Sequence, residues 1–323
     1  MKKFIKEFKP KDKVESVFLL KRKEVKKTKT DKPYLAVSLC DTTGSIEGRA
    51  WDNAAEMNEA VEAGQPVFVS GEVDSWRENI QLRVNRMRPA GEGEYEKHDL
   101  IRSVADIEGI FGKVKAYLSE VKSRPLSKLI EQFLGEADFV ERFKRAPGAL
   151  NWHNAYAGGL LEHTYEVMFI ADKTCSLYPQ ADRELCMVGA FLHDIGKIYE
   201  IDPQGLEYTV AGGMIGHLSL GFEVMSKKID AVKNFPDDLA LHLKHAVLSH
   251  HGEYEQQSPV LPKTLEATII YHADSLVSQA NAVKEIIEAQ SSFPRTWSNY
   301  ITIKNRKYLL SRPEHTAGEP GRP

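Results

Sequence analysis

Apolar and polar residues alternate along the first ninety residues of the chain. In five short stretches, β-branched and other apolar side chains alternate with polar ones, as in strands that are buried on one face. The predicted strands are 14–22, 34–41, 45–51, 66–73 and 80–88. Turn-forming residues such as Asp41 and Gly44 separate them.

A helical pattern interrupts these strands between the third and the fourth. It covers residues 54–63 and ends at Gly64. Five strands with a helix in this position have the order of elements found in an OB barrel. We therefore predict a multidomain chain that begins with a small all-β OB barrel over residues 1–90.

The spacing of apolar residues changes beyond residue 100. Apolar side chains then recur three and four positions apart, which is the spacing of amphipathic helices. The predicted helices are 101–121, 126–133, 159–177, 183–195, 214–232, 237–250 and 264–289. The pattern predicts a larger all-α bundle over residues 101–310, joined to the barrel by a linker at 91–100 and followed by a disordered tail at 311–323.

Positive charge is concentrated at the N-terminus. The chain has a net charge of −3, but residues 1–35 contain thirteen Lys and Arg against five Asp and Glu. A basic arm attracts polyanions such as nucleic acid. The same composition also suits a solvated N-terminus that improves solubility, so charge alone leaves both interpretations open.

Cysteine content and hydropathy indicate the cellular compartment in which the protein is expected. The three cysteines, Cys40, Cys175 and Cys186, lack CxxC spacing, which argues against a disulfide framework and a thiolate zinc site. No apolar run suits a signal peptide or a membrane span. We expect a cytoplasmic protein that does not act at a membrane.

Histidine is concentrated in the predicted helical bundle. Eight of the eleven histidines fall between His163 and His272, mostly in or at the end of predicted helices. One buried histidine is usually a core residue whose hydrogen bonds are satisfied. A group of imidazoles and carboxylates instead suits a divalent transition metal held between helices. The candidate ligands are His163, His193, Asp194, His217, His250, His251 and Asp274.

The order of these residues resembles the HD phosphohydrolase superfamily in its two-metal form, and the segment FLHDIGK is close to that family's signature. The resemblance implies that one metal binds His163, His193, Asp194 and Asp274. It implies that a second metal binds Asp194, His217 and His250, with His251 as a further ligand or a phosphate contact. Lys197 matches the lysine of the HD-x-G-K motif and is implied to contact the substrate phosphate. The alternative interpretation of Lys197 is an ordinary surface lysine.

Together with the barrel, the segments GGLLEHT, FLHDIGK, GHLSLG and LSHHGE resemble YhaM-type 3′–5′ exoribonucleases from about Val14 to Ile287. The resemblance implies hydrolysis of single-stranded RNA, with single-stranded DNA as a second candidate substrate. Two divalent metal ions would activate the attacking water. The resemblance suggests Mn²⁺, and Fe²⁺, Co²⁺, Ni²⁺ and Zn²⁺ suit the same ligands. Asp194 and Lys197 would be catalytic, and His153 and Glu162 would be substrate contacts or proton carriers. The sequence departs from the family at Asn154, where a second adjacent histidine is expected.

Aromatic and basic residues of the predicted barrel are candidate contacts for a nucleic acid, because bases stack on aromatic rings beside a basic groove. For any one aromatic residue, such as Trp51, a place in the core is an equally good interpretation. The candidates are Lys32, Tyr34, Arg49, Trp51, Trp76, Arg77 and Arg83.

Two other functions remain open at this point. An HD enzyme could hydrolyse nucleotides or cyclic nucleotides, with the barrel as an interaction module. The chain could also be a non-catalytic nucleic-acid-binding protein, but a decayed site should lose metal ligands first, and this set is complete. Exposed helices of an HD domain could pair, so a homo-oligomer is a further candidate.

Overall fold

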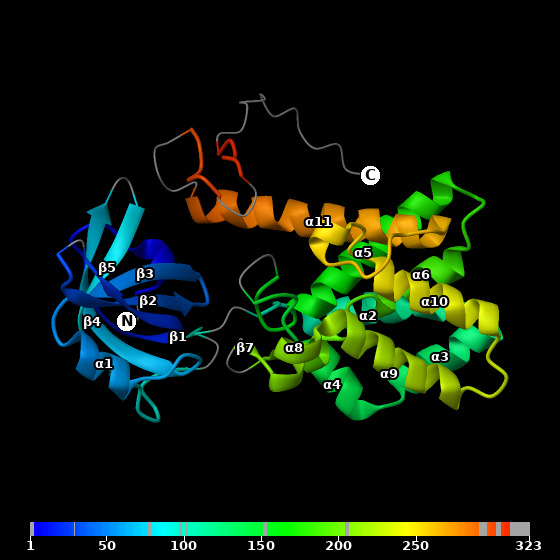
Figure 1. The fold of residues 1–323 in the computed structure, drawn as a ribbon, viewed down its shortest axis with the longest axis horizontal. Helices are drawn as coiled ribbons and strands as arrows, with labels where there is room; N and C mark the ends of the chain where they lie inside the picture. The colour runs from blue at the N-terminus through cyan, green and yellow to red at the C-terminus, as the bar shows by residue number, and fades with distance from the viewer. Residues whose placement is uncertain are drawn as a thin grey trace.

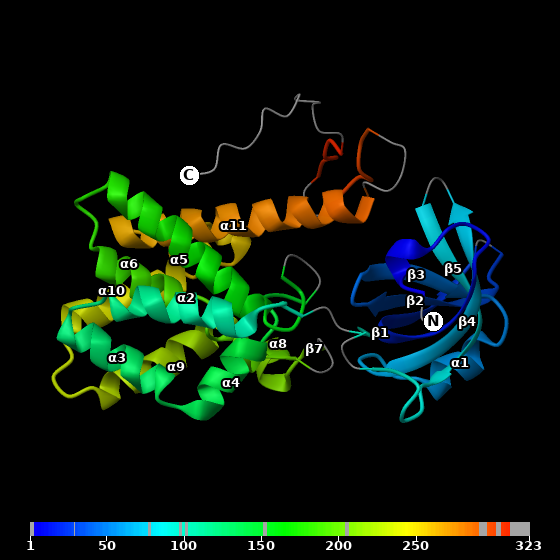
Figure 2. The ribbon, with the colours of Figure 1, turned by 180° about the vertical axis from the view of Figure 1, so that it is seen from behind.

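The computed structural model describes residues 3–28, 30–76, 79–96, 99–100, 103–150, 154–203, 207–290, 296–301 and 305–310. A closed five-stranded barrel occupies the N-terminal part, and a helical bundle follows it (Figures 1 and 2). The predicted fold class, a small all-β OB-like barrel followed by a larger all-α region, is confirmed.

Five strands close the barrel in the order β1–β2–β3–β5–β4. They are β1 (Lys13–Lys27), β2 (Pro33–Asp41), β3 (Gly44–Ala50), β4 (Pro66–Trp76) and β5 (Asn79–Pro89). Neighbouring strands are antiparallel except β3 and β5, which run parallel. A short 3₁₀ helix, η1 (Ile5–Glu7), precedes β1, and α1 (Ala54–Ala60) lies between β3 and β4 as predicted.

Alternate residues of each strand fill the interior of the barrel. Phe18, Leu35, Val69 and Leu82 are completely buried members of this core. Because successive side chains of a strand point to opposite faces, the residues between them lie on the outside of the barrel. The hydrophobic pattern thus determines which side chains a ligand on the barrel surface could reach.

The segment predicted as a linker packs on the outside of the barrel. Leu100 is buried in a small cluster with Val17 and Cys40. Arg88 donates two hydrogen bonds of 2.7 Å to the carboxylate of Glu94. The described part of residues 91–100 is therefore fixed to the barrel rather than extended between the two domains.

The second part of the chain is mainly helical. Its helices are α2 (Ile107–Ser119), α3 (Arg124–Leu134), α4 (Ala137–Arg145), α5 (Gly159–Leu177), α6 (Arg183–Leu192), α7 (Lys197–Glu200), α8 (Val210–Ile215), α9 (His217–Ala231), α10 (Asp237–Ser249), the 3₁₀ helix η3 (Tyr254–Gln256) and α11 (Leu265–Gln290). Helix α5 packs against α2, α4, α6 and α11. None of the described helices combines the length and the apolar character needed to cross a membrane.

Two of the predicted helices have different bounds for local reasons. The helix predicted over 101–121 begins at Ile107, because Asp106 caps it by accepting a hydrogen bond from the Gly109 amide (2.8 Å). The helix predicted over 214–232 is divided at Gly216, where φ is +77°. A left-handed residue ends one helix and redirects the next, so α8 and α9 are separate.

The structure also contains elements that the hydrophobic pattern did not predict. Helix α4 was missed, and the strands β6 (Ile201–Asp202) and β7 (Glu207–Tyr208) form a two-stranded hairpin within the helical part. The helix predicted over 183–195 ends at Leu192, three residues before the predicted end. The predicted tail at 311–323 lies outside the described residues.

Candidate metal centre and nucleic-acid interface

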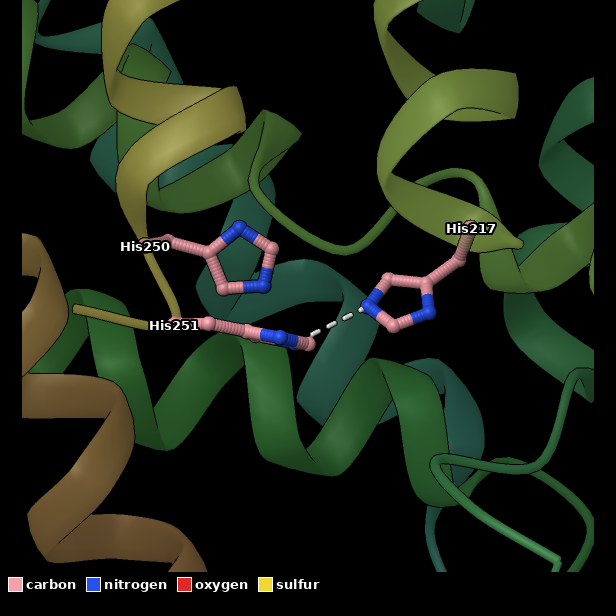
Figure 3. Close-up of side chains that lie close together, drawn as sticks. All are labelled: His217, His250 and His251. Atoms are coloured by element: carbon pink, nitrogen blue, oxygen red, sulfur yellow. Dashed lines mark hydrogen bonds between the residues drawn. The ribbon is translucent and has the colours of Figure 1, made fainter. Parts of the chain in front are cut away.

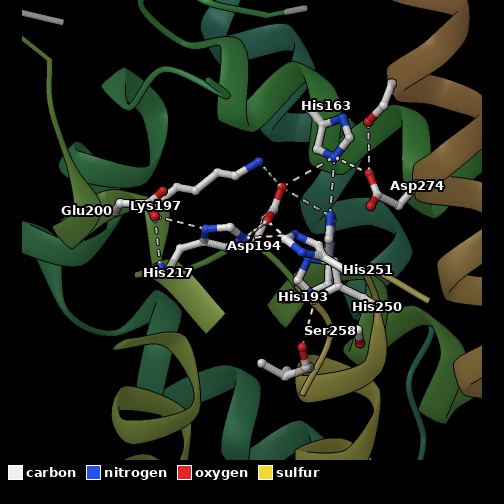
Figure 4. A network of polar contacts seen from close by, with 12 residues as sticks. His163, His193, Asp194, Lys197, Glu200, His217, His250, His251, Ser258 and Asp274 are labelled. Carbon is white, nitrogen blue, oxygen red and sulfur yellow. Dashed lines mark hydrogen bonds and ion pairs between the residues drawn. The ribbon is translucent and has the colours of Figure 1, made fainter. Parts of the chain in front are cut away.

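Seven histidine and aspartate side chains from separate parts of the helical bundle meet at one place (Figure 4). They are His163 of α5, His193 and Asp194 after α6, His217 at the start of α9, His250 and His251 after α10, and Asp274 of α11. All seven candidate ligands from the sequence therefore lie together.

The first group that could hold a metal ion consists of His163, His193 and Asp194. The Nε2 atom of His163 lies 3.2 Å from Nε2 of His193 and 3.4 Å from Oδ2 of Asp194. Asp274 Oδ1 lies 3.2 Å from the same nitrogen of His163. The side chains of the three group members are at most 2% exposed, so the group is shielded from bulk water.

The second group consists of His217, His250 and His251 (Figure 3). Nε2 of His217 lies 3.2 Å from Nε2 of His251. Nε2 of His217 and Nε2 of His250 lie 3.5 Å and 3.4 Å from Oδ1 of Asp194. Asp194 therefore lies between the two groups, with Oδ2 toward the first and Oδ1 toward the second.

Two pairs of neighbouring residues, His193–Asp194 and His250–His251, each place both side chains in one group. They can do so because each pair lies just beyond the end of a helix. Neighbours inside a helix point about 100° apart. Helix α10 ends at Ser249, however, and the chain turns beyond it. The rings of His250 and His251 lie 4.6 Å apart with their planes at 79°. The sequence left open which of these two histidines faces the centre, and the structure shows that both do.

Backbone carbonyls orient three of the imidazoles. Nδ1 of His193, His250 and His251 lies 2.7–2.8 Å from the carbonyl oxygens of Ala190, Val247 and Gln256, respectively. Because a carbonyl oxygen accepts only, Nδ1 carries the proton and donates it. A neutral ring then keeps its lone pair on Nε2, which is the arrangement that metal-binding histidines adopt.

Glu200, which is not among the site residues predicted from the sequence, orients His217 in the same way. Its Oε1 accepts hydrogen bonds from Nδ1 (3.0 Å) and from the backbone N–H (2.9 Å) of His217. Burial alone would raise the pKa of Glu200, but its contacts with His217 outweigh burial and lower it. In the sequence, nothing distinguished Glu200 from a surface glutamate.

Lys197, the first residue of α7, forms an ion pair with Asp194. Its Nζ atom lies 2.6 Å from Asp194 Oδ2, and its side chain is only 13% exposed. Burial would raise the pKa of Asp194, but the Lys197 ammonium and the His193 ring outweigh it, and the pKa lies well below its usual value. Lys197 is therefore part of the centre and not a surface lysine.

The residues present fit a metal ion. Oδ1 of Asp194 is buried and accepts no hydrogen bond from the described residues. A buried carboxylate oxygen without a donor is unfavourable. The nearest nitrogens, Nε2 of His217 and of His250, present lone pairs to it because the protons of both rings lie on Nδ1. A cation between these atoms would satisfy the carboxylate and both imidazoles.

Gly196 allows the turn after Asp194 to approach α9. A Cβ atom at this position would lie 2.0 Å from the carbonyl oxygen of His217 and 2.7 Å from the amide nitrogen of Gly221. The glycine of FLHDIGK thus permits the close contact that places His217 beside Asp194.

His153 and Glu162 were the two candidates for substrate contacts or proton carriers. His153 lies outside the described residues. Glu162 is hydrogen-bonded to the Tyr156 hydroxyl, which also receives a hydrogen bond from Nδ2 of Asn154 (3.1 Å). Asn281 of α11 donates to Oδ1 of Asn154 (3.2 Å). Glu162 therefore belongs to a polar network that links α5 and α11 beside His163, and Asn154, with φ of +57°, is a buried member of it.

Four of the seven candidate nucleic-acid contacts lie on one outer face of the barrel. The ring centroids of Tyr34 on β2 and Trp51 after β3 are 4.7 Å apart. Arg49 on β3 pairs with Arg83 on β5 in the parallel register. The guanidinium of Arg49 lies 5.9 Å from the centroid of the Tyr34 ring. Trp51 is only half-buried, so it is not a core residue.

The other three candidates add little to this face. Lys32 is exposed in the turn before β2. Arg77 and the side chain of Trp76 lie outside the described residues. The aromatic and basic surface defined by Tyr34, Arg49, Trp51 and Arg83 is called the barrel face below.

Comparison with protein families agrees with this division of the chain. Residues 160–278 match the family model of the HD domain, and residues 21–90 match that of an OB-fold nucleic acid binding domain. The chain combines an OB-fold domain with an HD domain. This is the architecture of a YhaM-type protein. Since an HD domain indicates a metal-dependent phosphohydrolase, the seven-residue centre lies in the part of the chain where that chemistry is expected.

A chain in the solved structure of a replication protein A heterotrimer bound to ssDNA is similar to this protein. The likeness covers 28% of this chain and 65% of the matched chain. The identity is 22% and the TM-score is 0.21. This chain therefore covers less than two thirds of the matched chain's length. A likeness this weak does not indicate what the OB-fold domain binds.

Proposed function

We propose that the protein is a metal-dependent 3′–5′ exoribonuclease that hydrolyses phosphodiester bonds of single-stranded RNA. The observation that carries the proposal is the position of Asp194. Its buried carboxylate lies between two groups of imidazoles whose Nε2 atoms face it, in a chain that also has an OB-fold domain.

The proposal assigns two metal ions to the seven side chains. One ion would bind His163, His193, Asp194 and Asp274. The other would bind Asp194, His217, His250 and His251, with Asp194 shared. Bound divalent cations of this kind lower the pKa of a coordinated water and neutralise charge on phosphoryl oxygens. Mn²⁺ is the ion that we propose.

The chain's own residues position these groups and the substrate. The carbonyls of Ala190, Val247 and Gln256 and the carboxylate of Glu200 hold the imidazoles in one tautomer. The Ser278 hydroxyl donates to Oδ1 of Asp274 (3.0 Å) and holds that carboxylate in place.

Lys197 is proposed to bind the scissile phosphate. Its ammonium has three protons, of which the hydrogen bond to Asp194 Oδ2 uses one. A remaining proton can be donated to a phosphoryl oxygen at the centre, where it stabilises the negative charge of the transition state. The barrel face would hold the rest of the strand, with bases on Tyr34 and Trp51 and phosphates beside Arg49 and Arg83.

Hydrolysis of end-labelled RNA tests the proposal. In the presence of Mn²⁺, a label at the 3′ end should be released at once as a mononucleotide, whereas a label at the 5′ end should remain on steadily shortening strands. Asp194→Ala should abolish both patterns and leave strand binding intact. Hydrolysis of mononucleotides or cyclic nucleotides in preference to RNA would contradict the proposal and favour a nucleotide phosphohydrolase.

A further inference from the structure

The chain doubles back after α11 and forms a small hairpin. Its described residues, 296–301 and 305–310, contain the antiparallel bridges Trp297–Leu309 and Ile301–Arg306. Figure 1 shows this segment in red, at the end of α11 that is nearer the barrel. We call it the C-terminal hairpin. Neither the HD model, which ends at residue 278, nor the metal centre includes it.

One side of the C-terminal hairpin attaches it to the bundle. Ser298 and Leu310 are buried, with 3% and 7% exposure. The amide of Asn299 donates to the side-chain oxygen of Gln290 in the last turn of α11 (2.9 Å). The hairpin is therefore a fixed extension of α11.

The other side presents large apolar side chains to solvent. Trp297 is 54% exposed and its bridge partner Leu309 is 47% exposed. Bridge partners point to the same face of a hairpin, and their neighbours Ser298 and Leu310 point to the opposite, buried face. An exposed apolar pair that includes a large aromatic ring is typical of a binding surface.

The charge of this segment is entirely positive. Between Glu288 and Glu314 the sequence has five Lys and Arg residues and no Asp or Glu, although the whole chain has a net charge of −3. Arg306 and Lys307 are exposed on the described part of the hairpin. A polyanion is therefore the partner whose charge complements this surface.

We propose that the C-terminal hairpin is a second binding surface for single-stranded nucleic acid. Trp297 stacks on a base, and Lys307, two residues before Leu309 on the same exposed side, contacts phosphates. Exposed rings among basic residues are the combination that binds single strands without regard to sequence. The proposal rests on the proposed function for the identity of the strand, which is the substrate on its way to the metal centre.

The length of α11 sets the size of substrate that can reach the hairpin. Asp274 of the metal centre and Gln290 are sixteen residues apart on this helix. At a rise of 1.5 Å per residue they are separated by about 24 Å. A strand with stacked bases crosses that distance in about seven nucleotides. A dinucleotide held at the metal centre cannot touch the hairpin.

Strand binding without hydrolysis tests the inference. A fluorescently labelled RNA of about twenty nucleotides, long enough for both sites, is titrated with the full-length protein in EDTA, and anisotropy gives the affinity. Trp297→Ala should weaken binding at least about five-fold, as the loss of one stacked base does. Lys307→Ala should weaken it and reduce the slope of log affinity against log salt by about one. Tyr178→Ala and Lys233→Ala, which remove an exposed aromatic ring and an exposed lysine elsewhere, are the matched controls and should bind like the wild type.

The outcomes separate this inference from the proposed function. Reduced binding by the Trp297 and Lys307 variants supports the hairpin even if the protein hydrolyses no RNA, in which case only the proposed function fails. Wild-type affinity and salt slope in both variants would overturn the inference, and so would a wild-type protein that does not bind RNA. It would also be overturned if the variants lost binding to anionic lipid vesicles, or lost self-association, while they still bound RNA normally. With Mn²⁺ present, Trp297→Ala should slow degradation of the long RNA and leave dinucleotide hydrolysis unchanged.

Discussion

Four histidines of the metal centre are oriented by the group hydrogen-bonded to their Nδ1 atoms. His193, His250 and His251 donate to backbone carbonyls, and His217 donates to the carboxylate of Glu200. Of these four acceptors, only Glu200 can be removed by mutation without changing the backbone. It is therefore the most direct way to test whether imidazole orientation governs metal binding.

Glu200→Ala should weaken Mn²⁺ binding about 10- to 100-fold, because partners that orient a ligand histidine contribute on that scale. Isothermal titration of the metal-free protein measures this. Glu200→Gln keeps an acceptor for His217 and should recover much of the loss. Glu207→Ala, at an exposed glutamate of β7, is the control. If Glu200→Ala bound Mn²⁺ as tightly as Glu207→Ala, orientation of His217 would have no role.

The sequence predicted the candidate metal ligands but not the residues that orient them. Histidines and aspartates in an HD arrangement are recognisable because the residue types and their order are informative in themselves. Glu200 interacts with a residue seventeen positions away, and no local pattern records that contact. The barrel candidates show the same contrast, since their residue types made Tyr34 and Trp51 candidates but could not show that the two rings lie 4.7 Å apart.

Among the secondary-structure elements, the contact between the turn after α6 and the start of α9 matters most. Gly196 permits it, since any side chain there would meet the backbone of α9. Gly216 directs α9 toward the centre, with φ of +77°. Helical periodicity alone predicted one continuous helix over 214–232, because a single glycine changes the pattern of apolar residues very little. The division that places His217 at a helix start was therefore not predictable from periodicity.

Gly196→Ala should reduce the free energy of unfolding by about 1–3 kcal/mol, the usual effect of forcing extra atoms into a packed contact. It should also weaken metal binding, because α9 must move away from Asp194. Urea denaturation measures the first effect. Gly112→Ala in α2 is the matched control, because no atom lies within 4 Å of the added Cβ. That variant should be more stable by about 0.5–1 kcal/mol. Equal stability of the two variants would contradict the packing argument.

The segment after β5 is held to the barrel by an ion pair that depends on pH. Hydrogen bonds from Arg88 and from the Gly91 amide lower the pKa of Glu94 from its ordinary value of 4.5 to about 2. Because the folded-state pKa is below the unfolded value, the contact is fully present above about pH 4.5. It is lost as the pH falls toward 2. Carboxyl NMR titration should find this low pKa, and Arg88→Ala should return it toward 4.5. A wild-type value near 4.5 would contradict the pairing.

In the molecule as a whole, strand binding is proposed for the OB-fold domain and the C-terminal hairpin, and hydrolysis for the HD domain. The two functions should therefore be separable by mutation. Trp51→Ala should weaken binding of a long RNA by about 1–3 kcal/mol, the contribution of one stacked base. It should not change the rate of dinucleotide hydrolysis. Phe169→Ala, an exposed ring on α5, is the control. Equal losses on long and short substrates would mean that the barrel face does not act as a binding site.

Binding of two divalent cations by the seven side chains of the metal centre underlies the proposed function. Elemental analysis of the purified protein, after loading with Mn²⁺ and removal of free metal, measures it. We expect two metal ions per chain in the wild type and a clear loss in Asp194→Ala, which removes the shared ligand. Wild-type protein that retained no metal ion after this treatment would rule out the proposed centre.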